Sequence, residues 1–233
     1  MKFSFNTIGI VHSCYKEKFA IPRQAGLVKH ATASIELLSP YNHPDIVKGL
    51  DGFSHLWISF IFHQHVGKGW KNLVSPPRVE GQARYGVLAT RSSFRPNPMG
   101  LSVVKLESIE QTSERLLLHI SGADFLDKTP ILDIKPYIAY SDSLENTRSG
   151  FIKDIKEPGF NIKYSELALS QIKKAAEQYP DISQFIDELL MLDHRPHYVK
   201  KIKKDFSSRV YDYDLHWSVE GQEIYVMSLD NIS

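Results

Sequence analysis

Two arginines lie close together on a short, proline-stiffened segment, residues 89–100 (ATRSSFRPNPMG). Arginine in a rigid loop suits the planar, bidentate recognition of a carboxylate or phosphate. Pro96 and Pro98 restrict the loop, so less conformational entropy is lost when a ligand binds. For one loop alone, a tight turn with a solvated arginine is the simpler interpretation.

Three further loops also combine charged or polar side chains with turn-forming residues. The last of them places three carboxylates around a Thr-Pro turn. Together with the first loop they predict a site for an anionic ligand. These loops are residues 21–26 (IPRQAG), 62–65 (FHQH) and 124–133 (DFLDKTPILD).

Several familiar motifs are absent from the sequence. It has no G-x-G-x-x-G, no G-x-x-x-x-G-K-[ST], no C-x-x-C, no H-E-x-x-H and no G-x-S-x-G. His63 and His65 would share one face of a strand, but no third ligand accompanies them, so we predict no metal site. Cys14 is a candidate nucleophile, although a small structural residue is the favoured interpretation.

Composition indicates an ordinary globular chain. Its 233 residues are 42% hydrophobic and 24% charged, with a net charge of +1. We expect no transmembrane segment, no signal peptide and, given a single cysteine, a cytoplasmic protein. Basic residues gather locally, which indicates a confined basic site rather than a basic surface. The gathered residues are Arg78, Arg84, Arg91, Arg95 and Lys105, opposed only by Glu80.

The N-terminal part reads as a series of short strands separated by turn residues, with one short helix near 44–49. The segment 54–62 is apolar at successive positions, which predicts a strand buried on both faces. Many strands and little helix favour a barrel or a sandwich. The predicted strands are residues 5–11, 34–38, 54–62, 85–90, 101–109, 115–122 and 130–137.

The character of the chain changes near residue 141, where a polar linker begins. Two amphipathic helices are predicted at 165–179 and 181–192. Strands at 208–219 and 223–229 follow, joined by a hairpin turn. We therefore predict a mainly β protein with an N-terminal β-barrel-like domain, residues 1–142, and a small α+β C-terminal domain, residues 143–233.

Four segments resemble the signature segments of the TsaA-like family, and DHRPHY (193–198) resembles its bacterial members with a C-terminal extension, which are tRNA (adenine-N6)-methyltransferases. The resemblance spans nearly the whole chain. The four segments are YKEKFAIPRQAGLV (15–28), FSHLWISFIFHQ (53–64), ATRSSFRPNPMGLSVVKL (89–106) and DFLDKTPILDIKPY (124–137).

The resemblance implies a β-barrel that binds S-adenosylmethionine without a Rossmann fold. It also implies a homodimer that methylates N6 of threonylcarbamoyladenosine, next to the anticodon of threonine tRNAs. The implied cofactor-binding residues are Pro22, Arg23, Gln24, His63, Gln64, Arg91, Leu101, Asp127, Lys128, Thr129 and Pro130.

Lys128 departs from the family pattern, because many members have glycine at this position. A backbone contact would survive the change. A conformation that requires a positive φ would be strained by a lysine.

Roles within the site follow from what the resemblance implies, combined with residue chemistry. We assign Arg91 to the cofactor, Arg95 to the RNA or the threonyl carboxylate, and Asn97 to holding the loop. N6 of the modified adenosine is a urea-type nitrogen and a poor nucleophile, so a general base or a polarised carbonyl is expected. Candidate bases are Asp124, Asp127 and Asp133, then His63. The predicted catalytic residues are Asp124, Asp133 and Arg95.

The C-terminal domain offers further candidates for substrate binding. Arg195 and Tyr198 are predicted to contact the tRNA. For the lysine-rich run 199–204 a solvated loop is the favoured interpretation, and contact with the RNA backbone is the alternative. Two alternatives remain open at this point. One is an S-adenosylmethionine-binding sensor without catalysis, and the other is a methyltransferase that acts on a substrate other than tRNA.

Overall fold

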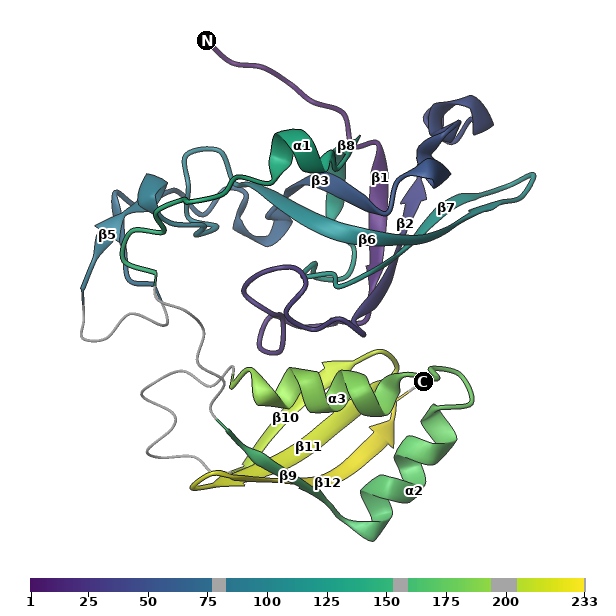
Figure 1. Cartoon of the computed structure of the whole chain (residues 1–233), viewed down its shortest axis with the longest axis vertical. Coiled ribbons are helices and arrows are strands. Elements are labelled where there is room, and N and C mark those ends of the chain that lie inside the picture. Colours follow the sequence, from purple (N-terminus) through teal and green to yellow (C-terminus); the bar gives the residue numbers. More distant parts are fainter. Residues whose placement is uncertain (77–82, 153–158, 194–204, 233) are drawn as a thin grey trace. The chain divides into compact units, whose positions relative to one another are not determined.

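A computed structural model describes residues 1–76, 83–152, 159–193 and 205–232 (Figure 1). The chain divides into two compact units that interleave along the sequence. One comprises residues 1–11, 34–120 and 128–155, and the other residues 12–33, 121–127 and 156–233. Within the described residues, no helix is long and apolar enough to cross a membrane.

Six strands close into a barrel in the order β1-β2-β7-β6-β3-β8. Along β3, buried and half-buried side chains alternate, because one face lines the barrel interior. The interior is filled by aliphatic side chains such as Ile35, Ile58 and Leu118, all 0% exposed. The strands are β1 (Gly9–Ser13), β2 (Thr32–Leu37), β3 (His55–Ile61), β6 (Met99–Gln111), β7 (Leu116–Ser121) and β8 (Pro130–Pro136).

The barrel confirms six of the predicted strands and corrects two details. The segment 85–90 contributes only the two-residue β5 (Tyr85–Gly86), paired with β4 (Leu73–Val74) outside the barrel, and then turns into a 3-10 helix, Val87–Ala89. The prediction that 54–62 is buried on both faces is wrong. Its second face lies on the outside of the barrel and is only half-buried.

Short helices decorate the barrel. The predicted helix near 44–49 is a 3-10 helix, Pro44–Val47, capped by His43, whose Nδ1 accepts a hydrogen bond from the Asp45 backbone N–H at 3.3 Å. A 3-10 turn, His63–His65, follows β3. The helix α1 (Ala139–Asp142) lies where a polar linker was predicted to begin.

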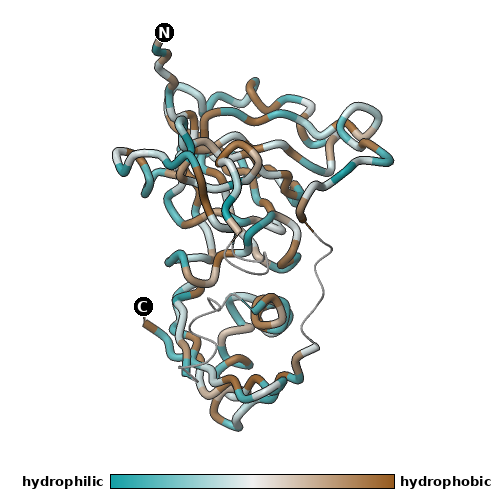
Figure 2. Tube along the Cα trace, turned by 90° about the vertical axis from the view of Figure 1, so that its left-hand side faces the viewer, coloured by the Kyte–Doolittle hydropathy of each residue, from teal (hydrophilic) through white to brown (hydrophobic). Residues whose placement is uncertain are grey.

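The second unit contains a four-stranded sheet, ordered β10-β11-β12-β9, with two helices packed on one face (Figure 1). Buried and exposed residues alternate along β10, and Figure 2 shows the hydrophobic and hydrophilic positions along the trace. The elements are β9 (Asn161–Tyr164), α2 (Glu166–Ala175), α3 (Ile182–Met191), β10 (Asp205–Val210), β11 (Tyr213–Glu220) and β12 (Glu223–Asn231).

Both predicted helices are confirmed, and Ser165 caps α2 by accepting a hydrogen bond from the Ala168 N–H at 2.9 Å. The hairpin turn between β11 and β12 is also confirmed. The segment 208–219, predicted as one strand, is instead two. The chain reverses at Tyr211, which has φ 51°, because a residue in the left-handed region cannot continue an extended strand.

The core of the second unit draws on both ends of the chain. Cys14, Tyr15, Ala20, Val28 and Ala31 share one hydrophobic cluster with α2, α3 and the C-terminal sheet. The segment after β1 also extends that sheet, since the Tyr211 N–H donates to the Cys14 carbonyl at 2.7 Å. A segment predicted to belong to the barrel domain is therefore folded together with the C-terminal elements.

Cys14 is 2% exposed, and burial raises the pKa of its thiol to about 12. We expect native protein at pH 8 to react with iodoacetamide at least about 100-fold more slowly than protein in denaturant. Because the folded-state pKa exceeds the ordinary value, the unfolding free energy should fall as pH rises from 9 towards 12, and Cys14→Ala should flatten that fall. Rapid labelling of the native thiol would contradict this structural role.

Candidate functional site

The outer face of β6, β3 and β8 brings two predicted site residues into one row. Leu101 pairs with Ser59, and Ser59 pairs on its other side with Asp133. The Leu101 side chain is 56% exposed, although it is aliphatic. The row therefore offers an apolar contact, a hydroxyl and a carboxylate side by side on the barrel surface.

The 3-10 turn that carries His63 and Gln64 packs against the arginine loop, residues 89–98. The Phe62 N–H donates to the Pro98 carbonyl at 2.7 Å. The His65 ring meets the Phe94 ring edge-on, with centroids 4.7 Å apart. Two segments predicted from residue type alone are thus in direct contact within one unit.

Within the arginine loop the two guanidinium groups differ. Arg95 is half-buried, and its Nη1 donates to the Thr90 carbonyl at 2.9 Å, which closes the loop on itself. Arg91 is exposed. Hydroxyl groups brace the turn between them, since Ser92 Oγ accepts from the Phe94 N–H at 3.2 Å. Arg95 therefore performs part of the loop-holding role predicted for Asn97.

At the start of β8, Lys128 has φ 63°, and its N–H donates to the Val11 carbonyl at 2.8 Å. The next residue, Thr129, is 3% exposed, and Pro130 begins the strand. The strain foreseen for a lysine at this position is present, because the left-handed region costs a residue with a Cβ about 1–2 kcal/mol.

Lys128→Gly should therefore raise the free energy of unfolding, by up to about 1 kcal/mol after the entropy of glycine is subtracted. Chemical denaturation would measure it. Lys105→Gly, in the extended strand β6, is the matched control and should lower stability by about 1 kcal/mol. A loss of stability in Lys128→Gly would mean that contacts of the lysine side chain outweigh the backbone strain.

In the second unit, the motif Pro22, Arg23 and Gln24 lies in the segment between β1 and β2. The Gly26 N–H that follows it donates to the Gly122 carbonyl at 2.8 Å. Further along, His30 is held by α3: its backbone N–H donates to Glu188 Oε2 at 3.0 Å, and its Nδ1 lies 2.9 Å from Oε1. The segment is thus fixed at two points that follow the motif in the chain.

Two of the candidate carboxylates, Asp127 and Asp133, each bind a backbone N–H and a lysine. Asp127 Oδ1 accepts from the Ser13 N–H at 2.8 Å and Oδ2 pairs with Lys16 at 3.1 Å. Asp133 accepts from the Ile134 N–H at 3.0 Å and also pairs with Lys135. Both side chains serve local structure, which makes each a weaker candidate for proton transfer.

Asp124 is half-buried near the phenol of Tyr15. Burial first, and then nearby groups that include Asp124, raise the pKa of Tyr15 well above its ordinary value. Among the described residues the Tyr15 hydroxyl has no hydrogen-bond partner, an uncommon state for a group that is 0% exposed.

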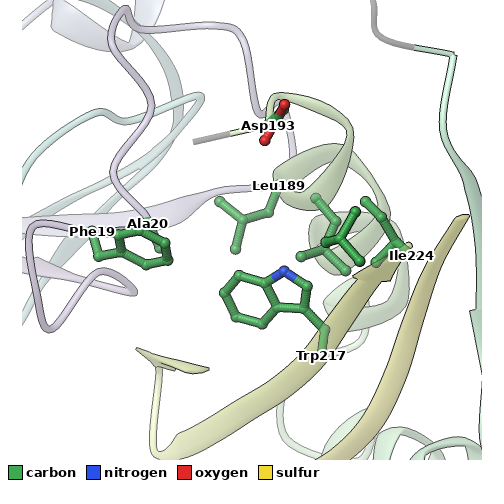
Figure 3. A pocket seen from close by; sticks show the side chains of 8 residues that line it. Phe19, Ala20, Leu189, Asp193, Trp217 and Ile224 are labelled. Atoms are coloured by element: carbon green, nitrogen blue, oxygen red, sulfur yellow. The ribbon is translucent and has the colours of Figure 1, made fainter. Parts of the chain in front are cut away.

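The second unit contains a small apolar pocket (Figure 3). Two of its lining residues, Phe19 and Ala20, lie just before the Pro22 motif in the sequence. The rings of Phe19 and Trp217 stack at 6.2 Å, and Phe19 also stacks on Phe206 at 6.3 Å. This packing holds residue 19 against the C-terminal sheet. The pocket is lined by Phe19, Ala20, Leu189, Leu190, Asp193, Trp217, Val219 and Ile224.

The predicted residues belong to both compact units. Those at 22–24, together with Asp124 and Asp127, belong to the second unit, and the remaining described ones belong to the first. Arg195, Tyr198 and the run 199–204 lie outside the described residues. In the part of the chain that the structure describes, no group of three or more His, Cys, Asp or Glu residues is arranged to hold a metal ion.

Sequence reasoning missed the residues that hold these segments in place. The Phe94 ring contacts the His65 ring and lies under the Lys71 ammonium group, and the Glu188 carboxylate binds the His30 ring. The spacing of Phe94 between the two arginines was a usable signal. The pairing of His30 with Glu188 spans 158 positions and has no sequence signature.

Comparisons with known proteins agree over the full length. Residues 10–143 match the family described as "tRNA-methyltransferase O N-terminal domain", and residues 157–232 match the "TrmO C-terminal domain". The chain is 40% identical over 230 residues to the tRNA (adenine(37)-N6)-methyltransferase of Escherichia coli K12, covering 98% of each protein.

A protein of Pseudomonas aeruginosa described as a putative S-adenosylmethionine-dependent methyltransferase is 40% identical over 219 residues, 93% of each chain. The crystal structure of TrmO from Pseudomonas aeruginosa superposes with a TM-score of 0.81 at 35% identity, covering 99% of both chains. The chain therefore belongs to the TrmO family of S-adenosylmethionine-dependent tRNA (adenine-N6)-methyltransferases.

Proposed function

We propose that the chain methylates N6 of threonylcarbamoyladenosine next to the anticodon of threonine tRNAs. The observation that carries this proposal is the braced arginine loop. In this loop Arg91 is an exposed residue and Arg95 is half-buried, with its Nη1 bound to the Thr90 carbonyl. The threonyl carboxylate and the RNA phosphates are partners that a guanidinium binds well.

The residues of the barrel suit S-adenosylmethionine, which combines an apolar purine with a zwitterionic amino-acid end. The exposed Leu101 offers apolar contact, and Arg91 offers a partner for a carboxylate. We assign binding of the cofactor to eleven positions. They are Pro22, Arg23, Gln24, His63, Gln64, Arg91, Leu101, Asp127, Lys128, Thr129 and Pro130.

When bound, S-adenosylmethionine supplies a methyl group from its sulfonium. The chain must orient N6 and assist the loss of its proton, because a urea-type nitrogen is a weak nucleophile. Asp124 is our first candidate for the base, because it is half-buried near the Tyr15 phenol. Arg95 is assigned to the carboxylate and to lowering the N6 pKa through its charge.

We propose a different role for each of the two domains. Residues 1–142 hold the cofactor and residues 143–233 complete the active site or bind tRNA. The packing of Tyr15 against Phe185, with ring centroids 5.9 Å apart, supports a completing role, because it ties the segment before Pro22 to α3. A homodimer and a cytoplasmic location are part of the same proposal.

The test uses labelled S-adenosylmethionine and two threonine tRNAs, one with and one without the threonylcarbamoyl group. Nucleoside analysis after digestion should find label only on the threonylcarbamoylated adenosine. Equal label on both tRNAs would show that the side chain is not recognised. Cofactor binding without label on either tRNA would indicate a different substrate or a binding protein.

Arg95→Lys should lower kcat/KM for the modified tRNA by about tenfold or more, because lysine cannot make a bidentate contact with a carboxylate. The thermal midpoint should change little, since an ammonium group can still reach a carbonyl within the loop. A substrate whose threonyl carboxylate is esterified separates the two roles. The variant should lose no further activity on the ester, and an equal loss on both substrates would assign Arg95 to the loop alone.

A further inference from the structure

A large aromatic side chain is exposed in the loop that follows the 3-10 turn, residues 66–72 (VGKGWKN), which we call the tryptophan loop. Trp70 is 56% exposed, although tryptophan is strongly apolar. It is flanked by the exposed Lys68 and Lys71. The indole does not contribute to the barrel core, so its exposure between two lysines indicates that it binds a partner.

The backbone of the loop presents this side chain outwards. Gly67 and Gly69 have φ of 79° and 73°, in the region that favours glycine, and a Cβ at either would meet nothing within 4 Å. The Lys68 N–H donates to the His65 carbonyl at 3.1 Å. The tip is therefore a defined turn in open surroundings.

The base of the tryptophan loop is fixed to the arginine loop. The Lys71 N–H donates to the Phe94 carbonyl at 3.1 Å, and Lys71 Nζ lies 4.5 Å from the centroid of the Phe94 ring. The Asn72 carbonyl accepts from the Val87 N–H at 3.0 Å. Trp70 is thus held beside the segment that carries Arg91 and Arg95.

The positive charge of this region indicates which kind of partner it binds. The described residues between positions 54 and 104 contain five Lys and Arg residues and no Asp or Glu. A positively charged surface with an exposed aromatic ring is the arrangement that binds single-stranded nucleic acid, because the ring stacks on a base while the cations contact phosphates. A symmetric contact with a second copy would bring the same positive charges together.

We propose that Trp70 stacks on an unpaired base of the tRNA anticodon loop and that Lys68 contacts its phosphate backbone. This inference rests on the proposed function and assigns to it a base-stacking residue outside the predicted cofactor and catalytic set. The stacking is independent of sequence, because every base has a π face. Selection of the modified adenosine remains with the arginine loop.

The experiment measures binding of the full-length protein to an anticodon stem-loop RNA and to a fully paired duplex of equal length. Trp70→Ala should weaken stem-loop binding about tenfold or more, and Trp70→Phe should restore most of it. Duplex binding and S-adenosylmethionine affinity should stay unchanged. Lys68→Gln should reduce the slope of log K against log salt by about 0.7.

Tyr140→Ala is the matched control, because Tyr140 is an aromatic residue of the same unit that is 93% exposed and lies outside residues 54–104. It should bind the stem-loop like the wild type. Unchanged stem-loop binding by Trp70→Ala would overturn the inference while leaving the proposed function intact. A changed oligomeric state with unchanged RNA binding would instead assign the loop to a contact between copies. Failure of the wild type to bind or methylate RNA would remove the proposed function itself.

Discussion

Phe185→Ala is expected to lower the free energy of unfolding by about 3–5 kcal/mol, because it removes a fully buried aromatic side chain and leaves a cavity. Phe185 lies on α3, and its ring contacts Tyr15 and Tyr211 at centroid distances of 5.9 and 5.3 Å. These contacts tie the segment between β1 and β2 to the C-terminal core. Thermal and chemical unfolding of the full-length protein would measure the loss.

The same substitution should also weaken S-adenosylmethionine binding, measured by calorimetry below the thermal midpoint. The reason is that the loosened segment carries Pro22, Arg23 and Gln24, which we assign to the cofactor. Leu167→Ala is the control, because Leu167 is on α2 and 56% exposed, so its loss should change stability by less than about 0.5 kcal/mol. Should Phe185→Ala fail to fold, Phe185→Leu gives a smaller cavity. Destabilised protein with unchanged cofactor affinity would count against the assignment of residues 22–24.

Gly100→Ala should lower stability by about 3 kcal/mol, because a methyl group at this position would lie 2.1 Å from Cζ of the Phe60 ring. Phe60 pairs with Gly100 across β3 and β6, and its ring covers the glycine. Gly100 lies two residues after the arginine loop and directly precedes Leu101. Methylation activity should therefore fall together with stability.

Gly52→Ala is the matched control, since a Cβ there would meet nothing within 4 Å and φ is not in the positive region. It should be neutral to within about 0.5 kcal/mol. The double variant Gly100→Ala with Phe60→Leu should recover part of the lost stability, because it removes the ring that the methyl group strikes. Additive losses in the double variant would show that the clash is not the cause.

Much of the fold was predictable from local pattern. Short apolar runs separated by turn residues marked six barrel strands, and a period near 3.6 with Ser165 as cap marked α2. The strand predicted at 208–219 failed because Tyr211 is a β-favouring residue that here adopts φ 51°. Its hydroxyl contacts Thr32 Oγ1 at 2.8 Å, a pairing across 179 positions that no local window contains.

The chemistry of the site was predictable at the level of residue type. The Arg, Pro and Gln content of four loops indicated an anionic ligand, and the family resemblance supplied the cofactor. The use of each side chain was not predictable. Arg95 donates to Thr90, Asp127 binds Lys16, and Lys128 adopts a positive φ, because each of these depends on how a loop closes in space.

By itself, the sequence determined which segments form strands and helices and which loops carry the reactive groups, because periodicity and turn residues act over a few neighbouring positions. Only the tertiary structure decided which surface buries each apolar face. It placed residues 14–31 in one core with α2, α3 and the C-terminal sheet, although more than a hundred residues of chain separate them. A hydrophobic pattern specifies that a face will be buried but not by what, since the hydrophobic effect is non-directional.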